Sequence, residues 1–182
     1  MNKQITLTFV LIAAFLAAGP VWSDDMMSSG VPDKATQVLS DLHQSNRNEI
    51  EMGRLAKEKG SSDQVRSYGD KVIKDQEVAD QQVRDLAQKD GITLFVPATQ
   101  GLLEHHAAAK EQKLMVELSH KSGADFDKAF AQVMVANHLR DISKLQKAEK
   151  LLRQADVREF VARLLPTLQE HLQMAQQLQK NS

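Results

Sequence analysis

The chain of 182 residues contains no cysteine, which excludes disulfides, thiolate nucleophiles, cysteine-ligated zinc and a lipid anchor on cysteine. Aromatic residues make up only 4%, with one Trp and one Tyr, so no row of rings is available for stacking nucleobases. Neither sign of charge is in excess, because 23 Lys and Arg accompany 24 Asp and Glu. A nucleic-acid partner is therefore not expected.

Motifs of common enzymes are also missing. The sequence has no Gly-rich phosphate loop, no nucleophile elbow and no His-Glu-x-x-His. With no complete catalytic set, the sequence favours a non-catalytic protein over an enzyme. Only four prolines and eight glycines interrupt a chain rich in Ala, Leu, Gln, Lys and Glu, which predicts an all-α fold.

The N-terminus has the pattern of a secretory signal peptide. Lys3 provides a positive charge before the apolar run Ile5–Ala18, which is shorter than the roughly 20 residues of a membrane span. Gly19-Pro20 then interrupts the helix, and cleavage is expected after about Ser23. An uncleaved N-terminal anchor is the alternative.

This pattern predicts a division of the chain into a signal peptide at 1–23, a flexible lead-in at 24–34 and a helical domain at 35–182. No apolar run of membrane-spanning length remains after residue 23. The mature protein is therefore expected to be soluble and exported, with the periplasm as its location and without a membrane span. Its protein partners are not indicated.

Apolar residues recur at steps of three and four, the spacing of amphipathic helices. The predicted helices are Lys34–Lys59, Asp63–Asp90, Thr99–Lys121, Asp125–Arg153 and Asp156–Lys180. Gly91 is placed to end the second helix, and Pro166 is expected to kink the last one without ending it. Short turns join the first two and the last two long helices. The sequence thus predicts a four-helix bundle of the ferritin-like kind, built from two hairpins with an extra crossover helix.

Each long helix carries one polar residue in the middle of its apolar stripe: Glu49, Gln76, His138 and His171. Burying such groups is costly unless they are paired or bound. Bundles of this kind hold metals with inward carboxylates and imidazoles. One hypothesis therefore makes Glu49, His138 and His171 ligands of a divalent Zn, Mn, Fe or Cu ion, with Gln76 as a weak ligand or as a hydrogen-bond donor to one.

The alternative is a buried polar network that fixes the register of the helices without any metal. Two functions consequently stay open. One is a non-catalytic exported protein that acts through contacts in the cell envelope. The other is a metal-binding protein with a weak redox or storage role. A di-iron centre is not expected, because the only Glu-x-x-His, Glu117 to His120, lies on the crossover helix.

Four segments follow one another with a recognisable order and spacing. They are Glu49-Ile-Glu-Met-Gly-Arg-Leu-Ala56, Val65-Arg-Ser-Tyr68, Phe126-Asp-Lys-Ala-Phe130, and Leu165-Pro166 followed by His171. Together they resemble the DUF4142 family, exported bacterial proteins often labelled putative outer-membrane proteins, over Val38 to Leu178. The resemblance implies the ferritin-like fold and export, and no particular reaction.

The family usually shows Asp-His where this chain has Asp75-Gln76. The resemblance thus implies that this member has lost one inward histidine and that, where the family site binds a metal, this member binds it more weakly or not at all. The outer-membrane label does not suit the residues. An all-helical chain without a lipid anchor is not expected to reside in an outer membrane.

Overall fold

The computed structural model describes residues 33–95 and 113–182. Its long elements are α1 (Lys34–Lys59), α2 (Asp63–Lys89), α4 (Gly123–Glu149) and α5 (Ala155–Asn181). Residues 113–119 form a further, short α-helix, and the described residues contain no strand. The all-α prediction is confirmed. The predicted signal peptide, nearly all of the lead-in and most of the crossover helix lie outside the described residues.

Local hydrogen bonds set the helix limits. The Asp33 carboxylate accepts a hydrogen bond from the amide of Ala35 at 2.8 Å and so caps α1. At the end of α2, Gly91 has a φ of 65°, and the Ile92 amide donates to the Ala87 carbonyl at 2.8 Å. This left-handed turn closes the helix, as predicted for Gly91, because glycine adopts a positive φ without steric cost.

The two later helices differ slightly from their predicted limits. α4 ends at Glu149, before the predicted Arg153, where the Leu151 amide donates to the Ala148 carbonyl three residues back. This turn buries Leu152 in the core. α5 continues unbroken through Pro166.

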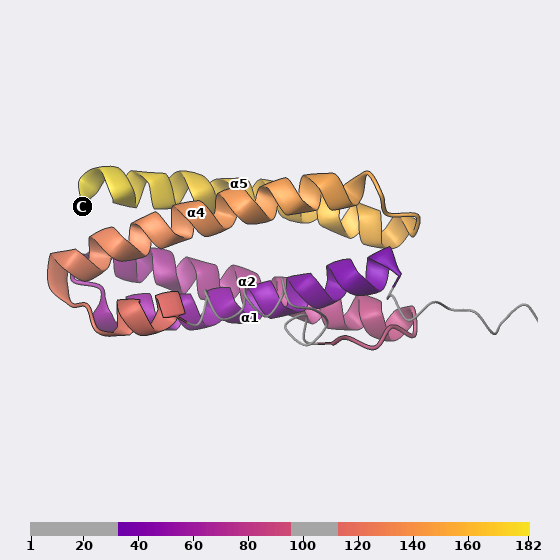
Figure 1. The fold of residues 1–182 in the computed structure, drawn as a ribbon, viewed down its shortest axis with the longest axis horizontal. Coiled ribbons are helices and arrows are strands. Elements are labelled where there is room, and N and C mark those ends of the chain that lie inside the picture. Colours follow the sequence, from indigo (N-terminus) through magenta and orange to yellow (C-terminus); the bar gives the residue numbers. More distant parts are fainter. Residues whose placement is uncertain (1–32, 96–112) are drawn as a thin grey trace, which may run out of the picture. The chain divides into compact units, whose positions relative to one another are not determined.

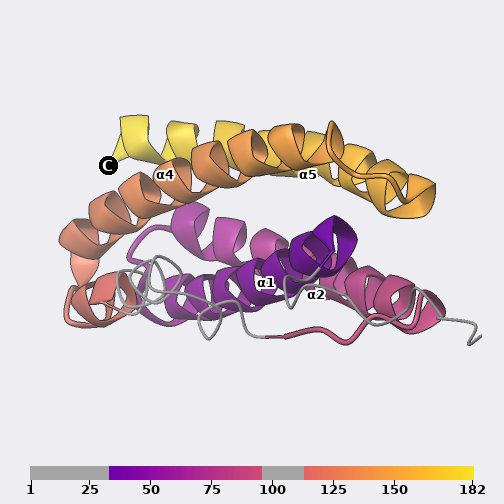
Figure 2. The same cartoon turned by 45° about the vertical axis from the view of Figure 1, so that its right-hand side comes forward.

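The four long helices form two antiparallel hairpins, α1 with α2 and α4 with α5. The hairpins pack on each other through α1 against α4 and α2 against α5 (Figure 1 and Figure 2). α2 and α4 run in the same direction, so α2 ends at one end of the helices and α4 begins at the other.

The core consists of two apolar clusters at opposite ends of the helices. The first cluster includes Leu39, Val83, Leu145 and Phe160, and the second includes Met52, Tyr68, Phe130 and Leu178. Every long helix contributes to both clusters and carries buried polar residues between its two contributions. The polar residues of the four helices therefore share one layer at mid-height.

α1 and α2 approach each other closely beside this layer, at Gly53 and Gly69. A β-carbon at Gly53 would lie 2.8 Å from the Gly69 carbonyl oxygen, and one at Gly69 would lie 2.7 Å from the Gly53 carbonyl oxygen. Side chains larger than hydrogen would force the helices apart here. The close approach holds the polar side chains one turn away, such as Glu49, against those of α2.

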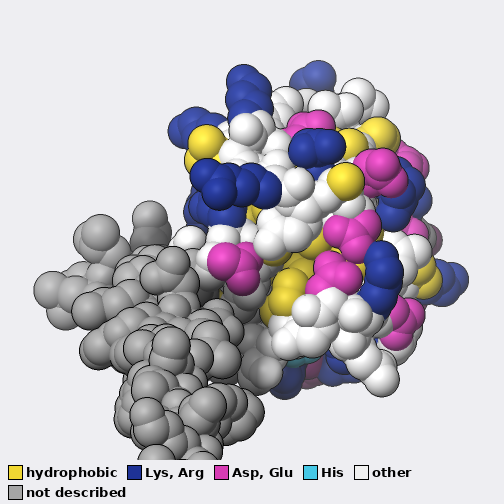
Figure 3. All heavy atoms as spheres, turned by 90° about the vertical axis from the view of Figure 1, so that its right-hand side faces the viewer, with side chains coloured by type: hydrophobic (Ala, Val, Ile, Leu, Met, Phe, Trp, Pro, Cys, Tyr) yellow, Lys and Arg dark blue, Asp and Glu magenta, His cyan; other side chains and the backbone are white. Residues whose placement is uncertain are grey.

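The surface is polar and mixed in charge. On the end of the helices that Figure 3 shows, Lys and Arg side chains are interspersed with Asp and Glu rather than separated from them. This view shows no basic face of the kind that nucleic acid requires. Among the described residues, no helix is both long and apolar enough to cross a membrane.

Candidate metal centre

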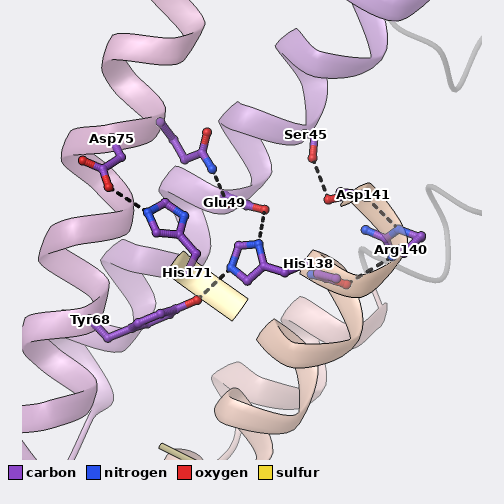
Figure 4. Close-up of polar contacts among 10 residues, drawn as sticks. Ser45, Glu49, Tyr68, Asp75, His138, Arg140, Asp141 and His171 are labelled. Atoms are coloured by element: carbon purple, nitrogen blue, oxygen red, sulfur yellow. Dashed lines mark hydrogen bonds and ion pairs between the residues drawn. The ribbon is translucent and has the colours of Figure 1, made fainter. Parts of the chain in front are cut away.

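The structure brings the four predicted site residues together in the polar layer. Glu49 on α1, Gln76 on α2, His138 on α4 and His171 on α5 are all buried, with at most 4% of each residue exposed. One potential ligand atom from each of Glu49, His138 and His171 lies within 4.8 Å of the other two. Figure 4 shows the carboxyl group of Glu49 next to the ring of His138, with His171 facing them.

His171 is oriented by Asp75, which lies on α2. The Nε2 atom of His171 lies 2.7 Å from Asp75 Oδ2. Burial alone would raise the pKa of Asp75, but the hydrogen bonds from His171 and Lys71 lower it. Because the carboxylate is ionised and can only accept, Nε2 must carry the proton, and the lone pair of a neutral ring then resides on Nδ1. This Nδ1 atom is buried and has no hydrogen-bond partner.

His138 is held in a similar way by Tyr68, also on α2. The Tyr68 hydroxyl lies 2.8 Å from His138 Nε2. The opposite nitrogen, Nδ1, is buried without a hydrogen-bond partner and faces Glu49 Oε1 at 3.4 Å. The two rings lie side by side, with centroids 5.4 Å apart. His138 thus turns an unbonded nitrogen toward the Glu49 carboxyl group, and a potential ligand atom of His171 lies within 4.8 Å of both groups.

Glu49 is fixed from the α2 side by Gln76. The Gln76 side-chain amide donates to Glu49 Oε2 at 2.5 Å. With the Asn46 amide oriented to satisfy its neighbours, Asn46 donates to Gln76 Oε1 at 2.9 Å and accepts from the Asp80 amide at 3.2 Å. Both ends of the Gln76 side chain are therefore engaged, and it presents a donor, rather than an oxygen ligand, to the cluster.

Burial sets the charge of the cluster. It raises the pKa of Glu49 to about 8, with a further contribution from the nearby Asp141 carboxylate. It lowers the pKa of His138 to about 4 and also lowers the pKa of His171. At neutral pH without a cation, all three groups are therefore uncharged. A bound cation would favour the ionised carboxylate and the neutral rings, which are the forms that bind metals.

The donor set suits a divalent transition metal. Ligand atoms in a tetrahedral zinc shell lie about 3.4 Å apart, given metal–ligand bonds of about 2.0–2.2 Å. The separation of His138 Nδ1 and Glu49 Oε1 is already 3.4 Å. Metal-bound histidines commonly donate their second ring N–H to a carboxylate or another oxygen. Asp75 and Tyr68 stand in these positions behind His171 and His138.

The three groups have almost no contact with solvent. The side chains of His138 and His171 are fully buried, and that of Glu49 is 5% exposed. Chemically, the arrangement offers two neutral nitrogens and one carboxyl group between the two hairpins.

The sequence pattern alone did not identify Asp75, Tyr68 and Asn46 as parts of the site. Asn46 lies three residues before Glu49, so helical spacing places it on the same buried face and could have found it. Tyr68 belongs to the apolar stripe of α2, where its ring gives no hint of its hydroxyl partner. Asp75 carries no such signal, because its partner His171 is 96 residues away.

Fold and site together describe an all-helical protein with a buried Glu-His-His cluster between two helical hairpins. The profile of the DUF4142 family, described as a domain of unknown function, matches residues 23–178. The chain belongs to this family, and the resemblance seen in the sequence is confirmed. Comparisons with curated proteins and with solved structures gave no significant match.

Proposed function

We propose that this protein is an exported, non-catalytic bundle of the ferritin-like class that holds one divalent transition-metal ion between Glu49, His138 and His171. One observation carries the proposal. The Nδ1 atoms of two buried histidines lack hydrogen-bond partners, while Asp75 and Tyr68 engage their Nε2 atoms, and both histidines offer a ligand atom within 4.8 Å of one buried carboxyl group. Unpaired buried polar atoms are costly, and a cation would satisfy both nitrogens at once.

The ligand types narrow the choice of metal. Two imidazoles and one carboxylate suit Zn²⁺, Fe²⁺, Mn²⁺ or Cu²⁺. A set of three protein ligands leaves a coordination position for water. The burial of the three ligand residues supports retention of the ion, as in storage or sequestration, more than rapid exchange.

Other features support the ferritin-like fold class and the export of the protein. A single long connection between parallel α2 and α4 is the topology of ferritin-like bundles. Export is supported by Lys3 and the apolar run Ile5–Ala18, followed by a cleavage pattern at Ser23. Expression in a Gram-negative host, fractionation and mass measurement of the mature chain test this part. Retention in the cytoplasm with Met1 intact would contradict it.

Metal binding is tested by loading the purified protein separately with Zn²⁺ and Co²⁺ and measuring the bound ion per chain after dialysis. We expect one ion per chain in the wild type and none in His138→Ala or His171→Ala. His43→Ala is a matched control, because His43 is a partly buried histidine of α1 that contacts Asp80 instead of the cluster.

Three results decide between the alternatives. Binding that is lost in both site variants and kept in His43→Ala supports the proposal. Binding that is lost only in His43→Ala places the metal elsewhere. If the wild type takes up no ion under any loading condition, the cluster is a polar network that fixes the register of the four helices.

A further inference from the structure

The buried cluster needs a path by which an ion from solvent reaches it. The two apolar clusters close both ends of the helices. Between α4 and α5, the residues next to the histidines are buried and apolar, among them Met134, Ile142 and Ala175. A hydrated cation is strongly disfavoured in such surroundings. The path must therefore follow one of the polar sides of the cluster.

The α1–α2 side is closed by paired groups. The Gly53–Gly69 contact brings the two backbones together on one side of the layer. On the other side of the polar layer, Asp80 binds His43 through Oδ1 and Arg84 through Oδ2. On the α2–α5 side, Asp75 is bound to His171 Nε2, the nitrogen opposite the candidate ligand atom, and to Lys71.

The α1–α4 side is different. Asp141 follows His138 by one helical turn and therefore lies on the same face of α4. Ser45 precedes Glu49 by one turn and therefore lies on the same face of α1. The Ser45 hydroxyl donates to Asp141 Oδ2 at 3.1 Å. The Asp141 side chain is 13% exposed, which gives it contact with solvent. Figure 4 shows this pair beside the Glu49–His138 contact.

The charge of Asp141 is felt in the cluster. Burial has the largest effect on the pKa of Glu49 and of His138, and the Asp141 carboxylate acts on both groups as well, adding to the rise at Glu49 and opposing the fall at His138. The neighbouring residue Arg140 contacts Asp141. Its Nε lies 3.1 Å from Asp141 Oδ1 and its Nη1 donates to Asn137 Oδ1 at 3.1 Å, while 45% of its side chain is exposed.

We propose that Asp141 is the entry residue of the centre: it attracts a divalent cation from solvent and passes it between α1 and α4 to Glu49 and His138, while Arg140 opposes this entry until its side chain swings away. The proposal rests on the metal-binding function proposed above. In this proposal Asp141 contacts the ion only on its way to the cluster and is not a ligand of the bound ion.

The test measures the rate of Co²⁺ binding to the full-length mature protein by stopped-flow absorbance, together with the visible spectrum of the loaded state. Asp141→Asn keeps the shape and the Ser45 contact but removes the charge. We expect its association rate to fall about tenfold, the lower end of electrostatic steering effects. We expect Arg140→Gln to bind faster than the wild type. The Co²⁺ spectrum should stay unchanged in both variants.

Asp156→Asn is the matched control, since Asp156 is an acid paired with Lys89 at the end of the helices, and its loss should leave the rate unchanged. An unchanged rate in Asp141→Asn overturns the entry role, and so does slowing in Asp80→Asn alone. An altered Co²⁺ spectrum in Asp141→Asn makes Asp141 a ligand, which also overturns it. If the wild type binds no Co²⁺, the metal-binding function and the entry role fall together, whereas every other contrary result leaves the metal-binding function standing.

Discussion

Asp75 and His171 are joined by a 2.7 Å hydrogen bond that runs from the partly exposed surface of α2 to a fully buried ring on α5. The bond fixes which nitrogen of His171 carries the proton, and with it which nitrogen is free to bind an ion. We therefore expect Asp75→Ala to weaken Zn²⁺ binding about 10- to 100-fold, as for other groups that orient metal-bound histidines. A competition titration with a chromophoric chelator measures this change.

The control for Asp75 is Asp70→Ala, which removes an exposed acid of the same helix that pairs with Lys57. It should bind Zn²⁺ as the wild type does. Equal losses of affinity in both variants would show that only the negative charge of α2 matters, and not the orientation of the ring.

Tyr68 has two separable roles, because its ring packs edge-on against Phe130 while its hydroxyl contacts His138. Tyr68→Phe keeps the packing and removes the hydrogen bond. We expect the metal-free protein to lose about 1–3 kcal/mol of unfolding free energy, the usual cost of leaving a buried polar partner unpaired. Denaturation in urea with a chelator present measures this, and a variant as stable as the wild type would contradict it.

The raised pKa of Glu49 predicts that the metal-free protein loses stability as the pH rises. The folded state keeps a proton up to a pKa of about 8, whereas the unfolded chain releases it near 4.5. Between these values stability falls with pH. His138, with its pKa lowered from 6.5 to about 4, has the opposite effect up to about pH 6.5, so the loss emerges above that value.

From pH 6.5 to 8 we expect a loss on the order of 2 kcal/mol in the wild type, since each pH unit is worth about 1.4 kcal/mol for one proton. Glu49→Gln cannot ionise and should show a flat profile over this range. The measurement is urea denaturation at several pH values in the presence of a chelator. Parallel profiles for the two proteins would rule out Glu49 as the source.

Gln76 lies beside the candidate ligands, and its side-chain amide already reaches Glu49. Gln76→His would place a third neutral nitrogen, and thus a fourth candidate ligand, at the cluster. We expect Zn²⁺ affinity to rise by at least about tenfold, or about 1.4 kcal/mol of binding free energy. Gln76→Leu removes the amide without adding a ligand and should bring no gain. An equal affinity in Gln76→His and the wild type would count against the site.

Asp127 ties α4 to the turn between α1 and α2. Its carboxylate accepts hydrogen bonds from the amides of Ser61 and Ser62 and from the Ser61 hydroxyl, at 2.7–2.9 Å. Burial would raise the pKa of Asp127, but these bonds lower it. We expect Asp127→Ala to reduce the unfolding free energy by about 2–3 kcal/mol. Asp125→Ala, which removes an exposed acid in the first turn of α4, should cost less than about 1 kcal/mol.

The sequence was sufficient to place the polar layer, because helical spacing fixes the face on which Glu49, Gln76, His138 and His171 lie. Counting residues from each helix end then brings them to similar heights. The same reasoning could not find Asp75 or Asp141. Both are partly exposed, at the edge of the buried face of their helix, and their importance comes from contacts with helices distant in the sequence.

The same distinction between local and distant contacts applies to the ends of the helices. Gly91 and Asp33 act through their own local turns, so the ends of α2 and the start of α1 follow from the sequence. The end of α4 does not, because burial of Leu152 against the other helices decides where the chain turns.

The three candidate ligands are divided unequally between the hairpins, with Glu49 in one and both histidines in the other. An ion bound to all three would be a cross-link between two halves that otherwise meet mainly through α1–α4 and α2–α5 packing. The halves could not separate without releasing it, so the affinity for the metal would add to the free energy of unfolding. A chelator would then act on the loaded protein as a denaturant, and the metal supply of its compartment would set how long the folded protein survives there.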